Sequence, residues 1–269
     1  RCNFEISGLG LSRFGINYSN GELEKAIKSI KKIQNISIAG IHCHFPNRDL
    51  KSFEERLDIM IEISKKMFNH NLEYIDIGGG FFGNMEHSLK TQFSTSIPSY
   101  KDYANLITDK VNNVFFNKAE HLKPELIIEP GSALAADTMS YYVRVISIKK
   151  VKDIFIATVS GSKFNITPQS DSIDLPFKVI KKTIQKDIKK KFKIAGYTCI
   201  ESDYLSKECL ESIEEKDFIE YKNVGSYSIV LKPPFIHTNV PIIEVSEKKE
   251  TEVIKVKEEM DHVFQTYNF

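Results

Sequence analysis

The sequence predicts an α/β half followed by a mainly β half, and two observations support this fold class. Between residues 36 and 129, short apolar runs alternate with segments whose apolar residues recur at helical spacing. From about Met139 the apolar residues recur at a period of two, which is typical of antiparallel strands with one polar face. Strands that alternate with amphipathic helices indicate a parallel sheet, and such sheets bind ligands at the carboxyl ends of their strands.

The first half is expected to hold three strands and three helices. The strands are predicted over 36–45, 74–77 and 126–129, and the helices over 21–34, 50–69 and 100–114. A closed barrel of parallel strands needs about eight. Three strands therefore fit either a small open sheet or the second half of a barrel.

The second half is expected to be an antiparallel β domain. Its strands are predicted over 141–148, 154–159, 227–231, 242–245 and 252–256, with a short helix over 258–266.

A glycine-rich turn follows the middle strand of the first half. Gly78, Gly79 and Gly80 come directly after a short β-branched run, and three glycines there let the backbone approach a ligand closely. Several N–H groups can then point at one anion, of which phosphate is the commonest. The alternative is an ordinary tight turn.

Composition excludes several classes of protein. Hydrophobic residues make up 41% and charged residues 27% of the chain, and the formal net charge is +1. Nothing here favours nucleic acid or an acidic membrane surface as a partner. No apolar run approaches the roughly 20 residues needed to span a bilayer. The four cysteines show no paired spacing, so we expect reduced thiols, no metal site and a cytoplasmic location.

Several short motifs occur in an order that resembles one protein family. They are GIHCHF at 40–45, IDIGGGF at 75–81, EPG at 129–131, GYTCIESD at 196–203 and VGSY at 224–227. This set is similar to the pyridoxal-phosphate-dependent decarboxylases of the ornithine/diaminopimelate/arginine type, and the resemblance covers nearly the whole chain.

The resemblance implies a fold and a cofactor. Residues 1–137 would form the C-terminal half of a TIM-like (β/α)8 barrel of the alanine-racemase type, and residues 138–269 a C-terminal β domain with a short terminal helix. The cofactor would be pyridoxal 5'-phosphate. The family's cofactor-binding lysine lies on an early barrel strand, and no lysine here has a matching motif. We therefore expect this chain to be a piece of a longer protein and inactive alone.

The resemblance also implies roles in cofactor binding. Gly78–Gly80 and Gly131 would contact the cofactor, the glycine turn through its phosphate, and the Tyr227 hydroxyl would add a contact to that phosphate. Glu129 would face the pyridine nitrogen and keep it protonated, so that the ring can accept electrons. His44 would stack on the ring.

Catalysis would involve a second set of residues. Cys199 would return a proton to the substrate carbon after decarboxylation, and free thiols are mostly protonated at neutral pH. Glu201 and Asp203 would contact the substrate. In this family the cysteine reaches across a dimer interface, so a homodimer with shared active sites is expected.

Ordinary alternatives exist for three of these residues. His44 can be a hydrogen-bonded core histidine, Tyr227 a packed tyrosine and Cys199 a buried inert thiol. His42 is expected to point to the opposite face of its strand and to be structural.

Three positions depart from the family pattern. Ser132 stands where the family usually has an arginine that helps to bind phosphate. Pro46 and Asn47 replace a phosphate-contacting Gly-Ser. Ile200 occupies the usual place of the acid that meets the substrate's distal amine, with Glu201 one position later. We therefore expect a substrate pocket unlike those for ornithine or diaminopimelate.

The preferred function is decarboxylation of a small basic or diamino amino acid, or a derivative of one, within a longer protein. One alternative is a non-catalytic relative that binds a regulatory partner, and another is a racemase on the same barrel. The motifs at 199–203 and 225–227 are closer to the decarboxylase branch than to the racemases. The sequence does not name the substrate.

Overall fold

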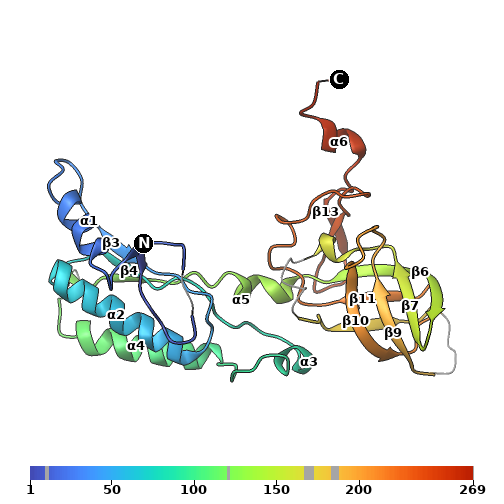
Figure 1. Cartoon of the computed structure of the whole chain (residues 1–269), viewed down its shortest axis with the longest axis horizontal. Helices are drawn as coiled ribbons and strands as arrows, with labels where there is room; N and C mark the ends of the chain where they lie inside the picture. The colour runs from blue at the N-terminus through green and yellow to red at the C-terminus, as the bar shows by residue number, and fades with distance from the viewer. Residues whose placement is uncertain (10–11, 120–121, 167–172, 183–187, 269) are drawn as a thin grey trace. The chain divides into compact units, whose positions relative to one another are not determined.

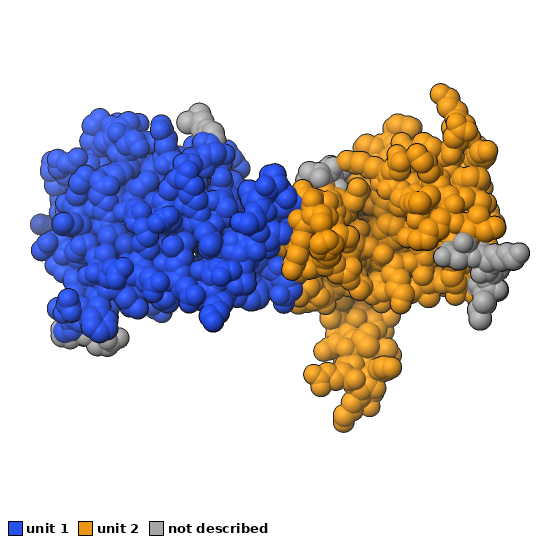
Figure 2. All heavy atoms as spheres, turned by 90° about the horizontal axis from the view of Figure 1, so that it is seen from below, with its two compact units in different colours: residues 1–84, 93–134 blue, residues 85–92, 135–269 orange. Residues whose placement is uncertain are grey.

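Two units make up the chain in the computed structural model, which describes residues 1–9, 12–119, 122–166, 173–182 and 188–268. Unit 1 consists of residues 1–84 and 93–134, and unit 2 of residues 85–92 and 135–269. Figure 2 colours unit 1 blue and unit 2 orange.

The centre of unit 1 is a three-stranded parallel sheet in the order β3-β4-β5. Its strands are β3 (Gly40–His42), β4 (Tyr74–Asp76) and β5 (Glu125–Ile127). Ile75 pairs with Ile41 on one side and with Leu126 on the other. The predicted parallel strands are confirmed, although the first is much shorter than expected and the third ends two residues early. A further parallel pair joins β1 (Cys2–Asn3) to β2 (Ile16–Asn17).

Three helices of unit 1 pack their apolar faces toward this sheet. They are α1 (Glu22–Ile30), α2 (Leu50–Phe68) and α4 (Tyr100–Phe115). Helix α1 ends four residues before the predicted end. Asp49 caps α2 by accepting a 2.9 Å hydrogen bond from Ser52 N, and Ser99 begins α4 with a capping box. Helices α2 and α4 lie side by side (Figure 1).

The core of unit 1 is built from the inner faces of these elements. Ile75 and Ile77 of the middle strand region meet Phe53, Leu57 and Met60 of α2, all of them buried. This packing holds the sheet in place and so determines where the carboxyl ends of its strands lie.

Unit 2 contains a six-stranded sheet in the order β10-β9-β7-β6-β11-β8. Its strands are β6 (Tyr141–Val151), β7 (Ile154–Val159), β8 (Phe177–Ile180), β9 (Lys190–Ala195), β10 (Tyr204–Glu211) and β11 (Phe218–Tyr221). The period of two along β6 and β7 predicted those two strands. The other four were not predicted from the sequence.

One pair in this sheet contradicts the purely antiparallel prediction. Strands β7 and β9 run parallel, with Phe155 opposite Phe192. Parallel neighbours need a long connection, and the chain between Val159 and Lys190 supplies one, since β8 lies at the far edge of the sheet.

The strand predicted over residues 227–231 is also wrong. Tyr227 has a positive φ of 61°, and its carbonyl accepts hydrogen bonds from Val230 N (3.1 Å) and Leu231 N (2.9 Å). The apolar run therefore folds into a turn, with the Val230 side chain 74% exposed.

The remaining elements are short. Unit 2 also holds α3 (His87–Lys90), the hairpin of β12 (Ile242–Val245) and β13 (Thr251–Lys255), and α6 (Met260–Phe264), while α5 (Ser132–Ala135) spans the division between the units. The hairpin and α6 agree with the predicted elements to within a few residues. Among the described residues, no helix is both long enough and apolar enough to cross a membrane.

Candidate active site

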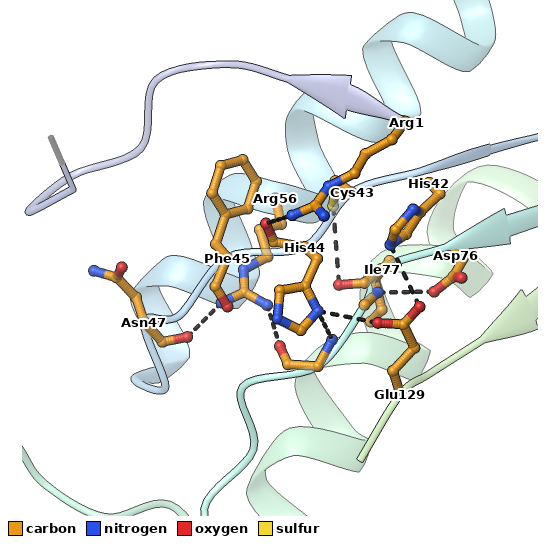
Figure 3. A network of polar contacts seen from close by, with 12 residues as sticks. Arg1, His42, Cys43, His44, Phe45, Asn47, Arg56, Asp76, Ile77 and Glu129 are labelled. Carbon is orange, nitrogen blue, oxygen red and sulfur yellow. Dashed lines mark hydrogen bonds and ion pairs between the residues drawn. The ribbon is translucent and has the colours of Figure 1, made fainter. Parts of the chain in front are cut away.

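The predicted cofactor residues of unit 1 gather where the three parallel strands end. His44 lies two residues after β3, Gly78 two residues after β4 and Glu129 two residues after β5. Parallel strands place their carboxyl ends on one edge of the sheet. Figure 3 shows the His44 and Glu129 side chains facing each other there, beside the glycine turn.

His44 and Glu129 are in direct contact. Nδ1 of His44 lies 3.0 Å from Oε2 of Glu129, and the Gly79 N–H donates to the same Nδ1 at 3.0 Å. Arg1 holds the backbone of His44 from the other direction, because its Nη2 donates to the His44 carbonyl at 2.8 Å. Both side chains stay about two-fifths exposed, so a ligand can reach them.

His42 also faces Glu129, which corrects the prediction that it points the other way. Side chains alternate along a strand, so residues two apart share a face. Nε2 of His42 lies 3.4 Å from Oε1 of Glu129 and has no hydrogen-bond partner. Partial burial lowers the pKa of His42 below its ordinary value of 6.5. The strand period applied correctly would have identified this residue.

The three side chains also lie close enough together to share one metal ion. One ligand atom from each of His42, His44 and Glu129 lies within 4.8 Å of the other two. Two imidazoles and one carboxylate are ligands that a divalent transition metal accepts. The expectation of no metal site therefore rests on the cysteine spacing alone.

The glycine turn uses two of its N–H groups within the chain. Gly78 N donates to Asp76 Oδ1 at 2.8 Å, and Gly79 N donates to His44. Gly78 and Gly80 have positive φ values of 70° and 91°, which favour glycine. Among the described residues, the N–H of Gly80 has no partner. Of the three glycines predicted to hold phosphate, Gly80 thus offers the free donor.

A buried arginine that was not predicted as a site residue lies behind this turn. Arg56 of α2 is fully buried. Its Nη1 donates to the Gly79 carbonyl at 2.6 Å and its Nη2 to the carbonyls of Phe45 (3.1 Å) and Asn47. Position 56 lies on the same helical stripe as Phe53 and Met60, and that spacing was the available signal.

The predicted catalytic and substrate residues of unit 2 lie in the loop between β9 and β10. Cys199 is exposed, whereas Cys2 and Cys43 are buried and Cys209 is half-buried. Glu201 is exposed as well. Cys199 is therefore the most accessible of the four thiols.

Asp203 holds this loop together from inside. Its side chain is buried. Oδ2 accepts from Thr198 N (3.1 Å) and Thr198 Oγ1 (2.7 Å), and Oδ1 accepts from Ser162 Oγ and Lys163 N, both at 3.0 Å. Its predicted contact with the substrate stays a prediction, because all four of these donors belong to the chain itself.

Two further predicted residues differ in their surroundings. Gly131 has a positive φ of 46° at the turn that follows Glu129. Tyr227 is 49% exposed in the turn described above. Neither makes a contact that tests its predicted role.

A comparison with known protein families shows to which family the chain belongs. A family model described as the pyridoxal-binding domain of pyridoxal-dependent decarboxylases matches residues 1–136. The chain belongs to the pyridoxal-dependent decarboxylase family. The match covers half of the 269 residues and includes all of the strand ends described above.

The relatives of this chain are longer proteins. It is 26% identical over 227 residues to a diaminopimelate decarboxylase of Haemophilus influenzae, covering 82% of the chain and 50% of that protein. It is 24% identical over 259 residues to one of Methanocaldococcus jannaschii, covering 94% and 56%. The chain spans about half the length of the curated relatives it matches.

A solved structure shares the fold. The crystal structure of the M. jannaschii diaminopimelate decarboxylase in complex with L-lysine matches with a TM-score of 0.80 and 21% identity, covering 96% of this chain and 58% of that one. At this identity the match shows the fold alone.

The residues present at the strand ends of this chain fit the family's cofactor, pyridoxal phosphate. A Cβ at Gly79 would lie 2.4 Å from the Glu129 carbonyl and 3.1 Å from the His44 ring, so only glycine leaves this surface open. The Gly80 N–H is a free donor for a phosphate oxygen. The Glu129 carboxylate suits a protonated ring nitrogen.

Proposed function

We propose that the protein is a pyridoxal-phosphate-dependent amino-acid decarboxylase that acts on a small diamino or basic amino acid. The observation that carries this proposal is the convergence of His44, Glu129 and the glycine turn at one sheet edge (Figure 3). Family membership supports the cofactor.

The proposed chemistry divides into separate tasks. When bound, pyridoxal phosphate accepts the electron pair that is left as carbon dioxide departs. Glu129 would hold a proton on the ring nitrogen, His44 would lie against the ring face, and Gly80 would donate its N–H to the phosphate. Gly131 and Tyr227 would add contacts to the cofactor.

The return of a proton to the substrate carbon is the task proposed for Cys199. A proton donor must lie within roughly 3–4 Å of the carbon that it protonates. The thiol of Cys199 is exposed, on a loop that the Asp203 carboxylate fixes. An accessible thiol on a rigid loop suits this role.

A diamino substrate is supported by the relatives and by one carboxylate. The relatives are diaminopimelate decarboxylases, and the M. jannaschii structure contains L-lysine. Glu201 is an exposed acid two residues after Cys199, and it could pair with a distal amine. Ile200 separates the two, so we expect selectivity that differs from that of the relatives.

The fold and assembly are proposed in the same way. We take residues 1–137 as the C-terminal part of a cofactor-binding barrel and residues 138–269 as a β domain. We propose a homodimer in which Cys199 of one subunit serves the cofactor site of the other, since a two-fold contact would create two equivalent sites.

The complete protein, supplied with pyridoxal phosphate, tests the proposed function. Carbon dioxide release should be measured with diaminopimelate, L-lysine, L-ornithine and L-arginine as substrates. We expect release from at least one of them, and its loss in Glu129→Ala but not in Glu125→Ala, which changes an exposed acid on the strand that precedes Glu129. Cofactor binding without release from any amino acid would instead favour the non-catalytic relative.

A further inference from the structure

Arg56 carries a buried positive charge, and none of the roles proposed above uses it. Its guanidinium lies 4.2 Å from the centre of the Phe53 ring and 5.5 Å from that of Phe45. Its Nε donates to Ser52 Oγ at 3.2 Å. With the three backbone carbonyls already described, the side chain makes four hydrogen bonds, none of them to an acid.

No ion pair among the described residues neutralises this charge. Asp49, at the start of the same helix, caps α2; its charge raises the pKa of Arg56, but it makes no ion pair with the guanidinium. Burial lowers the pKa of Arg56 to about 10, so the group remains charged at neutral pH. A buried charge without a directly paired opposite charge is costly, and an anion bound nearby would lower that cost.

The carbonyls that Arg56 binds determine where two N–H groups point. In a trans peptide the C=O and the following N–H lie on opposite sides of the chain. Since the Gly79 carbonyl turns toward Arg56, the Gly80 N–H turns away from it. The Asn47 carbonyl likewise directs the Arg48 N–H outward. Within the described part of the chain, neither N–H has a hydrogen-bond partner.

These two peptides are neighbours in space. A Cβ on Gly80 would lie 3.0 Å from the Asn47 carbonyl, 2.8 Å from that of Phe45 and 3.4 Å from Arg56 Nη2. Arg56 thus joins the glycine turn to the segment after His44 and stands directly behind both. Free N–H groups in front of a buried cation form a site for an oxyanion.

We propose that Arg56 is the positioning residue and the counter-charge of the phosphate subsite. This inference rests on the proposed function, because it assigns the oxyanion to the cofactor's phosphate. It also accounts for Ser132, which stands where the family usually has an arginine. In this chain the positive charge would come from α2, behind the turn.

Binding measurements on the complete protein test this role without using catalysis. The dissociation constants for pyridoxal phosphate and for pyridoxal, which lacks the phosphate, give the preference due to that group. The shift in melting temperature caused by inorganic phosphate gives a second readout. The variants are Arg56→Met, Arg56→Lys and, as a matched control, Lys51→Met, which removes a 70% exposed cation from the same helix.

We expect wild type and Lys51→Met to prefer pyridoxal phosphate equally and to be stabilised by inorganic phosphate. In Arg56→Met the preference for pyridoxal phosphate over pyridoxal should fall at least about tenfold, as expected for the loss of a charged hydrogen-bonded group. Most of the melting-temperature shift caused by inorganic phosphate should also be lost. Arg56→Lys should be intermediate, because one ammonium cannot hold three carbonyls in the same geometry. Adding Ser132→Arg to Arg56→Lys should restore part of the preference.

The outcomes separate this inference from the proposed function. An unchanged preference in both Arg56 variants, with an unchanged phosphate shift, would overturn the role of Arg56 alone. If Arg56→Met does not fold, the same measurements on Arg56→Lys and on the double variant with Ser132→Arg test the role of Arg56. In another outcome, inorganic phosphate stabilises the wild type through Arg56 while pyridoxal phosphate binds no better than inorganic phosphate. That result would overturn the proposed function but would still support an anion site at Arg56. A wild type without either response would overturn the inference.

Discussion

Nδ1 of His44 lies 3.0 Å from Oε2 of Glu129 and 3.0 Å from the N–H of Gly79. A neutral imidazole nitrogen either donates or accepts, so one tautomer cannot satisfy both neighbours. If Nδ1 accepts from Gly79, the Glu129 carboxylate is left facing a lone pair. A ligand that brings its own N–H to Glu129 would resolve this conflict, as a protonated ring nitrogen does.

Glu129→Gln in the complete protein should therefore lower turnover more than cofactor affinity. The amide cannot keep the ring nitrogen protonated, whereas the contacts to the phosphate persist. We expect a loss of at least about 100-fold in kcat and a change of less than about tenfold in the Kd for pyridoxal phosphate. Steady-state kinetics and a cofactor titration measure the two effects, with Glu125→Gln as the control. Equal kcat values in Glu129→Gln and wild type would remove Glu129 from its proposed role.

Mixing two inactive full-length variants tests the shared site. Cys199→Ala lacks the proposed proton donor and His44→Ala the proposed ring contact. In a mixed dimer one of the two sites receives both intact residues. We expect the mixture to recover up to about half of the activity per mixed dimer, a fraction that follows from the two-fold symmetry. If the subunits exchange and the mixture stays inactive, Cys199 acts within its own subunit or has no catalytic role.

Asp203→Ala should destabilise unit 2 and loosen the loop that carries Cys199. The substitution leaves buried donors of Ser162, Lys163 and Thr198 without their acceptor. We expect the free energy of unfolding to fall by about 3 kcal/mol, as measured by denaturant titration. The rate at which iodoacetamide alkylates Cys199 should also change. Glu201→Ala is the matched control: an exposed acid should change KM and leave stability unaltered. A stable Asp203→Ala protein with a raised KM would instead support its predicted substrate contact.

His42 predicts how the stability of unit 1 depends on pH. Burial lowers its pKa below 6.5, with Asp76 and Glu129 opposing the shift and Arg1 adding to it. Between the folded-state pKa and 6.5 the unfolded chain therefore binds more protons than the folded chain. The free energy of unfolding must rise with pH through this window and fall as the solution is acidified.

The variant His42→Gln removes this contribution. Its stability should decrease less than that of the wild type as the pH falls from about 7.5 to about 5. Denaturant titrations at each pH measure the difference. His70→Gln provides a comparison, because burial lowers the pKa of His70 as well. Parallel pH profiles for wild type and His42→Gln would contradict the prediction.

The sequence predicted the elements whose signals are strong and local. Helix α2 was predicted to within a residue, because Leu57 and Met60 belong to an apolar stripe at helical spacing. The glycine turn was found because it directly follows an apolar strand, and Glu129 because its motif resembles that of the family. The run at 227–231 misled the prediction, since its β-branched residues look like a strand. The positive φ of Tyr227 comes from the turn and cannot be inferred from the residue type.

The site residues that were missed depend on three-dimensional neighbours. Arg56 would be an exposed residue on most helices, and only the carbonyls of Phe45, Asn47 and Gly79 make its burial tolerable. Asp203 was expected to contact the substrate because its motif resembles that of the family, and this contact stays a prediction. Its burial follows from β9 and β10 closing around it, which no local pattern reports.

The contact between Gly196 and Asp203 also limits how this protein can evolve. A Cβ at position 196 would lie 2.1 Å from Oδ2 of Asp203, so no other residue fits there while the aspartate remains. Losing Asp203 first would leave its four donors unpaired before any new side chain could enter. Each single step is therefore unfavourable, and we expect natural variants to retain both residues or to replace both together.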